Sequence, residues 1–141
     1  MSRSGYTDDC ENLWLWRGAV ANAINGRRGQ VFLRELLASL DALPTPRLVA
    51  NELEENGQVC SLGAVGVRRG VDMTAIDPED HEHHQQLSKL FGIAPALVQE
   101  IEYMNDEGNY RNETPEERFT RMRAWVVEQI RAENGEAPTN F

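Results

Sequence analysis

Residues 29–43 read GQVFLRELLASLDAL, and the spacing of their apolar side chains predicts an amphipathic helix. On a helix these side chains share one inward face: Phe32, Leu33, Leu36, Leu37, Leu40 and Leu43. Pro44 and Pro46 forbid continuation, because proline lacks the backbone N–H that a helix interior needs. We therefore expect a helix that packs its leucine face against other elements and ends near residue 43.

Residues 10–25, CENLWLWRGAVANAIN, predict a second helix beside the first. Their apolar side chains form two stripes instead of one, and a helix that is apolar on two faces lies inside a bundle. Asn25 and Gly26 are typical of a helix end, because both residue types adopt a positive φ. The linker to Gly29 is short, so we expect the two helices to run antiparallel.

The middle of the chain contains a turn signal and a run of small residues. Asn56 and Gly57 lie between potential strands, which favours a short β-hairpin around residues 48–60. Gly63 and Gly66 make a helix over 61–69 costly, unless another part of the backbone approaches it closely. Trp14 or Trp16 is the expected neighbour of these glycines.

The sequence next predicts two helices, and a polar run ends the second of them. The range 77–92 begins with Asp77 as a cap, continues with proline and acidic residues, and ends at Gly92. The range 95–104 carries apolar residues at helical spacing, and the polar run 105–109 is expected to end it.

A capping box precedes the last helix. Thr114 can accept from the amide of Glu117, whose carboxylate can reach back, and Pro115 fits the first helical position. These signals predict a helix over 115–133.

These elements together predict a mainly α fold. We expect a single-domain bundle of five to six helices over residues 1–133, with one short β-hairpin and a polar tail at 134–141. The core is expected to include most of a set of ten large side chains: Trp14, Trp16, Leu33, Leu36, Leu37, Leu97, Ile101, Phe119, Met122 and Trp125.

Composition narrows the class of protein. The 141 residues include 14 basic and 23 acidic side chains, for a net charge of −9. An excess of this sign opposes binding to DNA or to anionic membranes. No run reaches the roughly 20 apolar residues of a membrane span, and no signal peptide is evident. We expect a protein of the bacterial cytoplasm in which Cys10 and Cys60 are free thiols.

The histidines cluster in the segment Asp80-His81-Glu82-His83-His84. On a helix His81 and His84 would share a face and could hold a metal with Asp77 or Asp80. Three or four converging ligands are needed for zinc, however, and no HExxH or CxxC spacing occurs. We interpret the segment as a solvated helix face, with His83 at an exposed position and no metal.

Other chemical signals are equally sparse. Arg27 and Arg28, between two glycines at a helix start, suit a phosphate but lack the Lys-Ser/Thr of a P-loop. No nucleophile motif such as GxSxG is present. We therefore expect no catalytic residues, no cofactor and no enzymatic activity.

Three segments carry a resemblance. Cys60-Ser61-Leu62-Gly63-Ala64-Val65 is followed by Asn105-Asp106-Glu107 and then by Thr114-Pro115-Glu116-Glu117-Arg118. In these segments the chain resembles small uncharacterised proteins of phages and prophages. The resemblance implies a shared helical fold but no activity. Asn105 and Asp106, with Tyr110 nearby in the sequence, are candidate ligand-binding residues. Arg27 and Arg28 are further candidates.

Two functions remain open. The first is a phage or prophage accessory protein that binds another protein, for example a bacterial host factor, through an acidic helical surface. The alternative is a small DNA-binding regulator, because residues 87–103 have helix-turn-helix spacing. Its second helix would present Gln99, Glu100, Glu102 and Tyr103 but no Arg or Lys, which opposes DNA binding.

Overall fold

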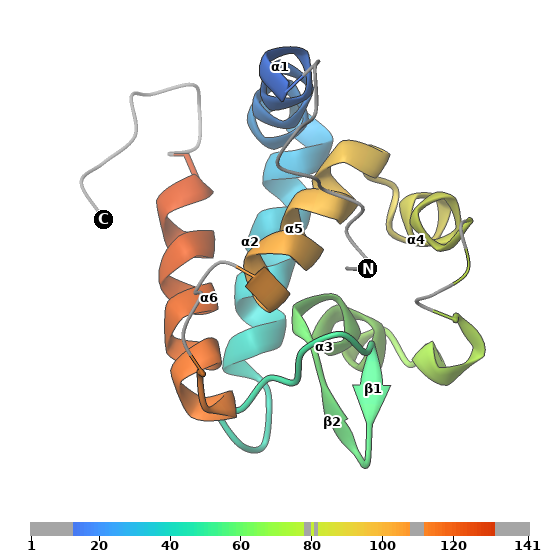
Figure 1. Ribbon diagram of the computed structural model, residues 1–141, viewed down its shortest axis with the longest axis vertical. Coiled ribbons are helices and arrows are strands. Elements are labelled where there is room, and N and C mark those ends of the chain that lie inside the picture. Colours follow the sequence, from blue (N-terminus) through green and yellow to red (C-terminus); the bar gives the residue numbers. More distant parts are fainter. Residues whose placement is uncertain (1–12, 78–79, 81, 108–111, 132–141) are drawn as a thin grey trace.

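The computed structural model describes residues 13–77, 80, 82–107 and 112–131, with side chains from residue 16 onward. The described part is mainly α, with one two-stranded hairpin, as the sequence predicted (Figure 1). Its elements in chain order are α1 (Leu13–Asn25), α2 (Arg27–Asp41), β1 (Glu54–Glu55), β2 (Gln58–Val59), α3 (Ser61–Arg68), the 3-10 helix η1 (Met73–Ala75), α4 (His83–Phe91), α5 (Pro95–Glu107) and α6 (Pro115–Gln129).

Helix α2 lies at the centre of the bundle. It packs against α1, α3 and α6, and its leucine face includes the fully buried Leu33 and Leu36. Only Gly26 separates it from α1. A Cβ at Gly29 would lie 1.9 Å from the carbonyl oxygen of Ala23, so only glycine allows the two helices to meet this closely.

The hairpin and α3 confirm the prediction for the middle of the chain. Glu54 pairs with Val59 across the hairpin, and Asn56 and Gly57 have φ values of 52° and 79°, which a tight turn of this kind requires. A Cβ at Gly63 would lie 2.0 Å from the carbonyl oxygen of Leu53. The close approach at Gly63 is therefore to Leu53 beside the hairpin, and not to Trp16 as expected, whereas the side chain of Trp14 lies outside the description.

Helix α4 starts later than the sequence suggested. It begins at His83, and Asp77 lies outside any helix, whereas Pro78 and Glu79 are outside the described residues. The residue before the helix, Glu82, makes no side-chain cap, and Asp80 Oδ1 accepts from the Glu82 amide at 2.9 Å in the turn that leads into α4. Gly92 ends the helix at a φ of 71°, as predicted.

Helix α5 corrects a second prediction. Asn105 was expected to break the helix, yet α5 continues to Glu107 and Asn105 is helical and fully buried. Its side chain is held by other elements, and these contacts outweigh the low helix propensity of asparagine.

The last helix begins as predicted and ends earlier. Thr114 Oγ1 accepts from Glu117 N at 3.1 Å, and Glu117 Oε1 accepts from Thr114 N at 2.9 Å. Both hydrogen bonds of the capping box are thus present. The last helical residue is Gln129, and residues 132–133 are outside the description.

One hydrophobic core joins these helices. Of the ten expected residues, six are buried: Leu33, Leu36, Leu97, Ile101, Met122 and Trp125. Trp16, Leu37 and Phe119 are partly buried against this core, and the side chain of Trp14 lies outside the description. Cys60 is a buried free thiol, and Cys10 is outside the described residues. Within the described ranges, no helix combines the length and hydropathy needed to cross a membrane.

Candidate functional site

Asn105 and Asp106 contact the residues that flank the hairpin. Asn105 Nδ2 donates to the carbonyl of Val49 at 2.9 Å, and Asn105 Oδ1 accepts from Ser61. Asp106 Oδ1 accepts from the amide of Asn51 at 3.0 Å. Because these polar atoms are engaged within the protein, Asn105 acts as a structural residue. Tyr110, the third member of the expected group, lies outside the described residues.

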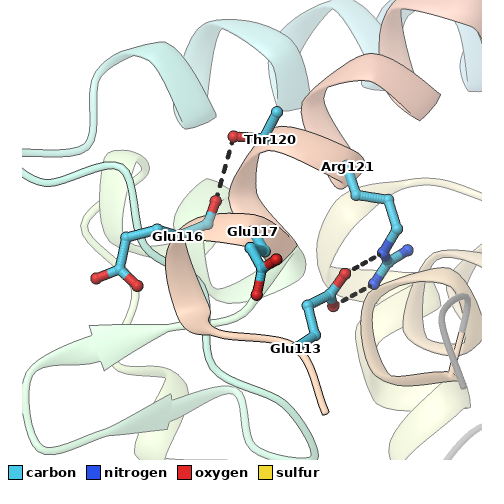
Figure 2. A pocket seen from close by; sticks show the side chains of 5 residues that line it. All are labelled: Glu113, Glu116, Glu117, Thr120 and Arg121. Atoms are coloured by element: carbon cyan, nitrogen blue, oxygen red, sulfur yellow. Dashed lines mark hydrogen bonds and ion pairs between the residues drawn. The ribbon is translucent and has the colours of Figure 1, made fainter. Parts of the chain in front are cut away.

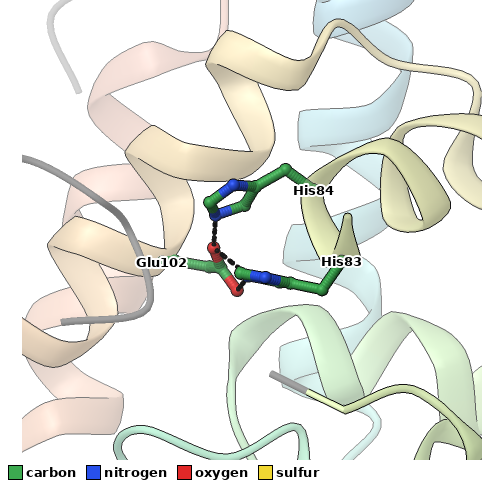
Figure 3. Close-up of side chains that lie close together, drawn as sticks. All are labelled: His83, His84 and Glu102. Atoms are coloured by element: carbon green, nitrogen blue, oxygen red, sulfur yellow. Dashed lines mark hydrogen bonds and ion pairs between the residues drawn. The ribbon is translucent and has the colours of Figure 1, made fainter. Parts of the chain in front are cut away.

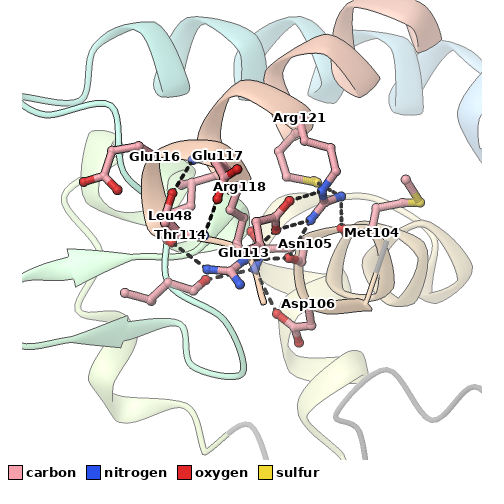
Figure 4. A network of polar contacts seen from close by, with 12 residues as sticks. Leu48, Met104, Asn105, Asp106, Glu113, Thr114, Glu116, Glu117, Arg118 and Arg121 are labelled. Atoms are coloured by element: carbon pink, nitrogen blue, oxygen red, sulfur yellow. Dashed lines mark hydrogen bonds and ion pairs between the residues drawn. The ribbon is translucent and has the colours of Figure 1, made fainter. Parts of the chain in front are cut away.

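Two arginines of α6 hold the C-terminal end of α5 (Figure 4). Arg118 Nε donates to the carbonyl of Asn105 at 3.0 Å, and Arg121 Nη2 donates to the same carbonyl at 3.1 Å. Arg121 also forms a two-hydrogen-bond ion pair with the buried carboxylate of Glu113, at 2.7 and 2.9 Å. Cations near a helix C-terminus are stabilising, so this network fixes α6 against α5. Sequence reasoning missed it, because the contacts depend on how the helices pack.

A hollow lies over the first turns of α6 (Figure 2). It is a shallow depression, wide open to solvent, with a volume of about 410 Å³, and Thr120, Arg121 and three glutamates line it: Glu113, Glu116 and Glu117. Glu116 is exposed and forms an ion pair with Arg47 at 2.9 Å. The hollow therefore presents carboxylate oxygens to solvent.

The hairpin adds further negative charge near this hollow. Glu52, Glu54 and Glu55 form no ion pair with any other described residue. Leu48 and Val49, which precede the hairpin in the chain, connect the hairpin to the start of α6. Leu48 N donates to the carbonyl of Pro115 at 3.1 Å, and Val49 N donates to the carbonyl of Val59 at 2.9 Å. We call the glutamates of the hairpin region and of the first turn of α6 the acidic surface: Glu52, Glu54, Glu55, Glu116 and Glu117.

Arg27 and Arg28 lie at another place. Both are exposed at the start of α2 and line a hollow of about 200 Å³ together with Glu35, Arg69 and other residues. Arg69 forms two hydrogen bonds with Glu35, at 2.6 and 2.7 Å, and these lower the pKa of the Glu35 carboxyl. A carboxylate inside this basic hollow opposes the binding of an anion.

Two histidines and a glutamate converge between α4 and α5 (Figure 3). His83 Nε2 lies 3.0 Å from Glu102 Oε2, and His84 Nε2 lies 2.6 Å from Glu102 Oε1. The exposed fractions are 3% for His83, 16% for His84 and 0% for Glu102. The interpretation of this segment as a solvated helix face is therefore wrong for His83. His81 is outside the described residues.

One sequence signal could have found this cluster. Glu102 follows Ile101 directly and lies four residues after Val98, so it borders the buried stripe of α5. A glutamate at such a position needs a partner, because a buried carboxylate is costly without one. The histidines of the preceding helix are the partners that the pattern offered.

The helices of the expected helix-turn-helix are present, but the face of α5 is used internally. Glu102 is held by the histidines, and Glu100 is buried and forms an ion pair with Arg17 at 2.7 Å. Gln99 and Tyr103 are half-buried. Two of the four side chains that would read DNA are thus enclosed in the bundle.

We compared the chain with known proteins at three levels. No family model, no curated protein and no solved structure matches it.

Proposed function

We propose that this chain is a phage or prophage accessory protein that binds a basic partner protein through the acidic surface. The observation that carries the proposal is the hollow at the start of α6, which is lined by glutamates and lies near carboxylates of the hairpin region that pair with no described cation. The resemblance of the sequence to phage proteins supports the expected origin.

Several carboxylates of the described surface are neutralised by arginines of the same chain, and Glu116 at the hollow is one of them through Arg47. Glu35 pairs with Arg69, and Asp41 pairs with Arg123. The carboxylates of Glu52 and Glu55 differ, because they are exposed and contact no described cation. Unneutralised charge of one sign attracts a partner of the opposite sign and raises the association rate.

A lysine or arginine of the partner fits the hollow. The space of about 410 Å³ accepts a long side chain, and carboxylate oxygens at its rim can accept charge-assisted hydrogen bonds. Glu116 can exchange its exposed pairing with Arg47 for a pairing with the partner. The proposal therefore specifies a basic, protruding element as the docking segment of the partner.

Affinity capture from a bacterial lysate with matched variants tests this function. The Glu55→Lys variant changes the charge of the acidic surface by two units, and Glu128→Lys makes the same change at an exposed site on the last turn of α6. Glu128 is twelve residues beyond Glu116, about 18 Å along the helix. We expect a protein that the parent and Glu128→Lys retain and that Glu55→Lys loses.

A second pair of variants tests the hollow itself. Thr120→Arg places a guanidinium in the hollow, whereas Ala124→Arg places one on the next turn of the same helix, at an exposed position. We expect only Thr120→Arg to reduce capture. Recovery of no partner, or equal recovery with all variants, would contradict the proposed function.

The structure offers no observation that favours the alternative, a DNA-binding regulator. Glu100 and Glu102 are buried, and α5 packs against α1, α3, α4 and α6. A recognition helix must instead present its side chains to the major groove. We therefore propose no DNA-binding role.

A further inference from the structure

We infer that His83, His84 and Glu102 form a binding site for a divalent transition metal, with Zn²⁺ as the ion that fits best. Each residue offers one ligand atom, and the three atoms lie within 4.8 Å of one another. The two imidazoles come from the first turn of α4, and the carboxylate comes from α5 (Figure 3). This site is distinct from the acidic surface and does not depend on the proposed function.

The hydrogen bonding of His83 supports a cation at this place. Its Nδ1 lies 2.9 Å from the carbonyl oxygen of Asp80, which can only accept, so Nδ1 carries a proton. In the neutral ring Nε2 then has a lone pair, and this lone pair faces the Glu102 carboxylate, which also only accepts. A cation between the two groups resolves the conflict without a further proton.

A backbone carbonyl behind a histidine is also the usual support of a metal ligand. It fixes the tautomer and aims the other nitrogen at the ion. Asp80 supplies this support to His83. The adjacent Glu82 amide donates to Asp80 Oδ1, so the turn that carries the carbonyl is itself held in place.

The distances are compatible with coordination by one ion. Ligand atoms about 2.0–2.2 Å from a shared Zn²⁺ lie about 3.3–3.6 Å from one another in a tetrahedral site. The His83 Nε2 atom lies 3.1 and 3.0 Å from the two oxygens of Glu102, so an outward movement of a few tenths of an ångström would bring it into this range. The His84 nitrogen is closer, at 2.6 Å, and would move outward when an ion enters.

The donor set determines the class of metal. Two imidazole nitrogens and one carboxylate suit Zn²⁺, Co²⁺ and Fe²⁺, whereas Mg²⁺ and Ca²⁺ prefer oxygen ligands. Three protein ligands leave a coordination position for water in a tetrahedral site. His84 is the most exposed of the three residues, so solvent reaches the site from its side.

The alternative is a metal-free ion pair, in which a protonated His83 imidazolium lies beside the Glu102 carboxylate. A metal titration of the full chain separates the two. After removal of metal with a chelator, we expect one equivalent of Co²⁺ to produce visible d–d absorption and Zn²⁺ to displace it. Zn²⁺ at about 100 times its Kd should raise the melting temperature by about 5–10 °C.

Variants assign the ligands. We expect His84→Gln and Glu102→Gln to weaken Zn²⁺ binding at least about tenfold, and the control Glu128→Gln, at an exposed position of α6, to leave it within twofold. Circular dichroism checks that each variant is folded, and the half-buried position of His84 makes its variant the more tolerant one. Absence of one-to-one binding, or an affinity that none of these ligand substitutions changes, would overturn the inference. Equal effects of Glu102→Gln and Glu128→Gln would also overturn it.

Discussion

Asn105 near the end of α5 caps the N-terminus of α3 through Ser61, the first residue of that helix. Its Oδ1 accepts from Ser61 N at 3.1 Å and from Ser61 Oγ at 2.8 Å. Helix N-termini leave amides without partners, and here a side chain from another helix supplies the acceptor. This contact ties α3 to α5 and, through Val49, to the chain beside the hairpin.

Removal of the Asn105 side chain should lower the stability of the protein. We predict that Asn105→Ala lowers the free energy of unfolding by about 2–4 kcal/mol, because it leaves the buried Ser61 amide and hydroxyl and the half-buried Val49 carbonyl without this partner. Ser61→Ala is the control, since it removes only the hydroxyl and should cost about 0.5–1.5 kcal/mol. Urea denaturation measures both values. Equal losses would mean that the Asn105 side chain does little beyond its bond to the Ser61 hydroxyl.

The close packing of α3 against the hairpin can be tested at glycines. We predict that Gly63→Ala destabilises the protein by about 1–3 kcal/mol, because the new methyl group would meet the Leu53 carbonyl at 2.0 Å. Gly18→Ala is the matched control on a helix, since its Cβ would meet no described atom within 4 Å and the change should stabilise the protein by about 0.5–1 kcal/mol. Thermal melts compare the two. A harmless Gly63→Ala would contradict the close approach.

The buried position of His83 gives a third prediction. In the metal-free protein, His83→Ala should cost about 2–4 kcal/mol, because it removes a partner from the fully buried Glu102. The exposed position expected from the sequence would have made this change nearly silent. His84→Ala should cost less, since His83 then still pairs with Glu102. A cost for His83→Ala near zero in urea denaturation would show that the pairing with Glu102 adds nothing to stability.

The pairing of Glu35 with Arg69 makes the stability of the protein depend on pH. The hydrogen bonds from Arg69 lower the pKa of Glu35 below its ordinary value of 4.5. The contribution of Glu35 to the free energy of unfolding is therefore fully present above pH 4.5, and it is lost as the pH falls through the lowered pKa. At pH 7 we predict that Glu35→Gln reduces stability by about 0.2–1 kcal/mol. The difference from the parent should shrink toward pH 3, and a difference that grows on acidification would contradict the assignment.

Local signals in the sequence predicted much of the fold, because they act over a few residues. The leucine spacing of α2, the Asn56-Gly57 turn and the capping box at Thr114 each specify their own geometry. Contacts between distant residues override such signals elsewhere. Asn105 stays helical because Ser61 and Val49 hold its side chain, although its residue type alone suggests a break.

The candidate sites were less accessible to sequence reasoning. Glu102 and His83 are 19 residues apart, and no spacing rule connects them. The hollow over α6 depends on how Glu113 folds back onto Arg121. Arg27 and Arg28 were recognisable as exposed cations, but the carboxylate of Glu35 in the same hollow was not.

Hydrogen–deuterium exchange tests the proposed docking surface most directly. The protein is measured alone and in complex with the captured partner. We predict slower exchange of the amides in residues 51–59 and 113–121, with little change in residues 95–101 of α5. Protection confined to α4 and α5, or absent from both segments of the acidic surface, would contradict a docking role for this surface.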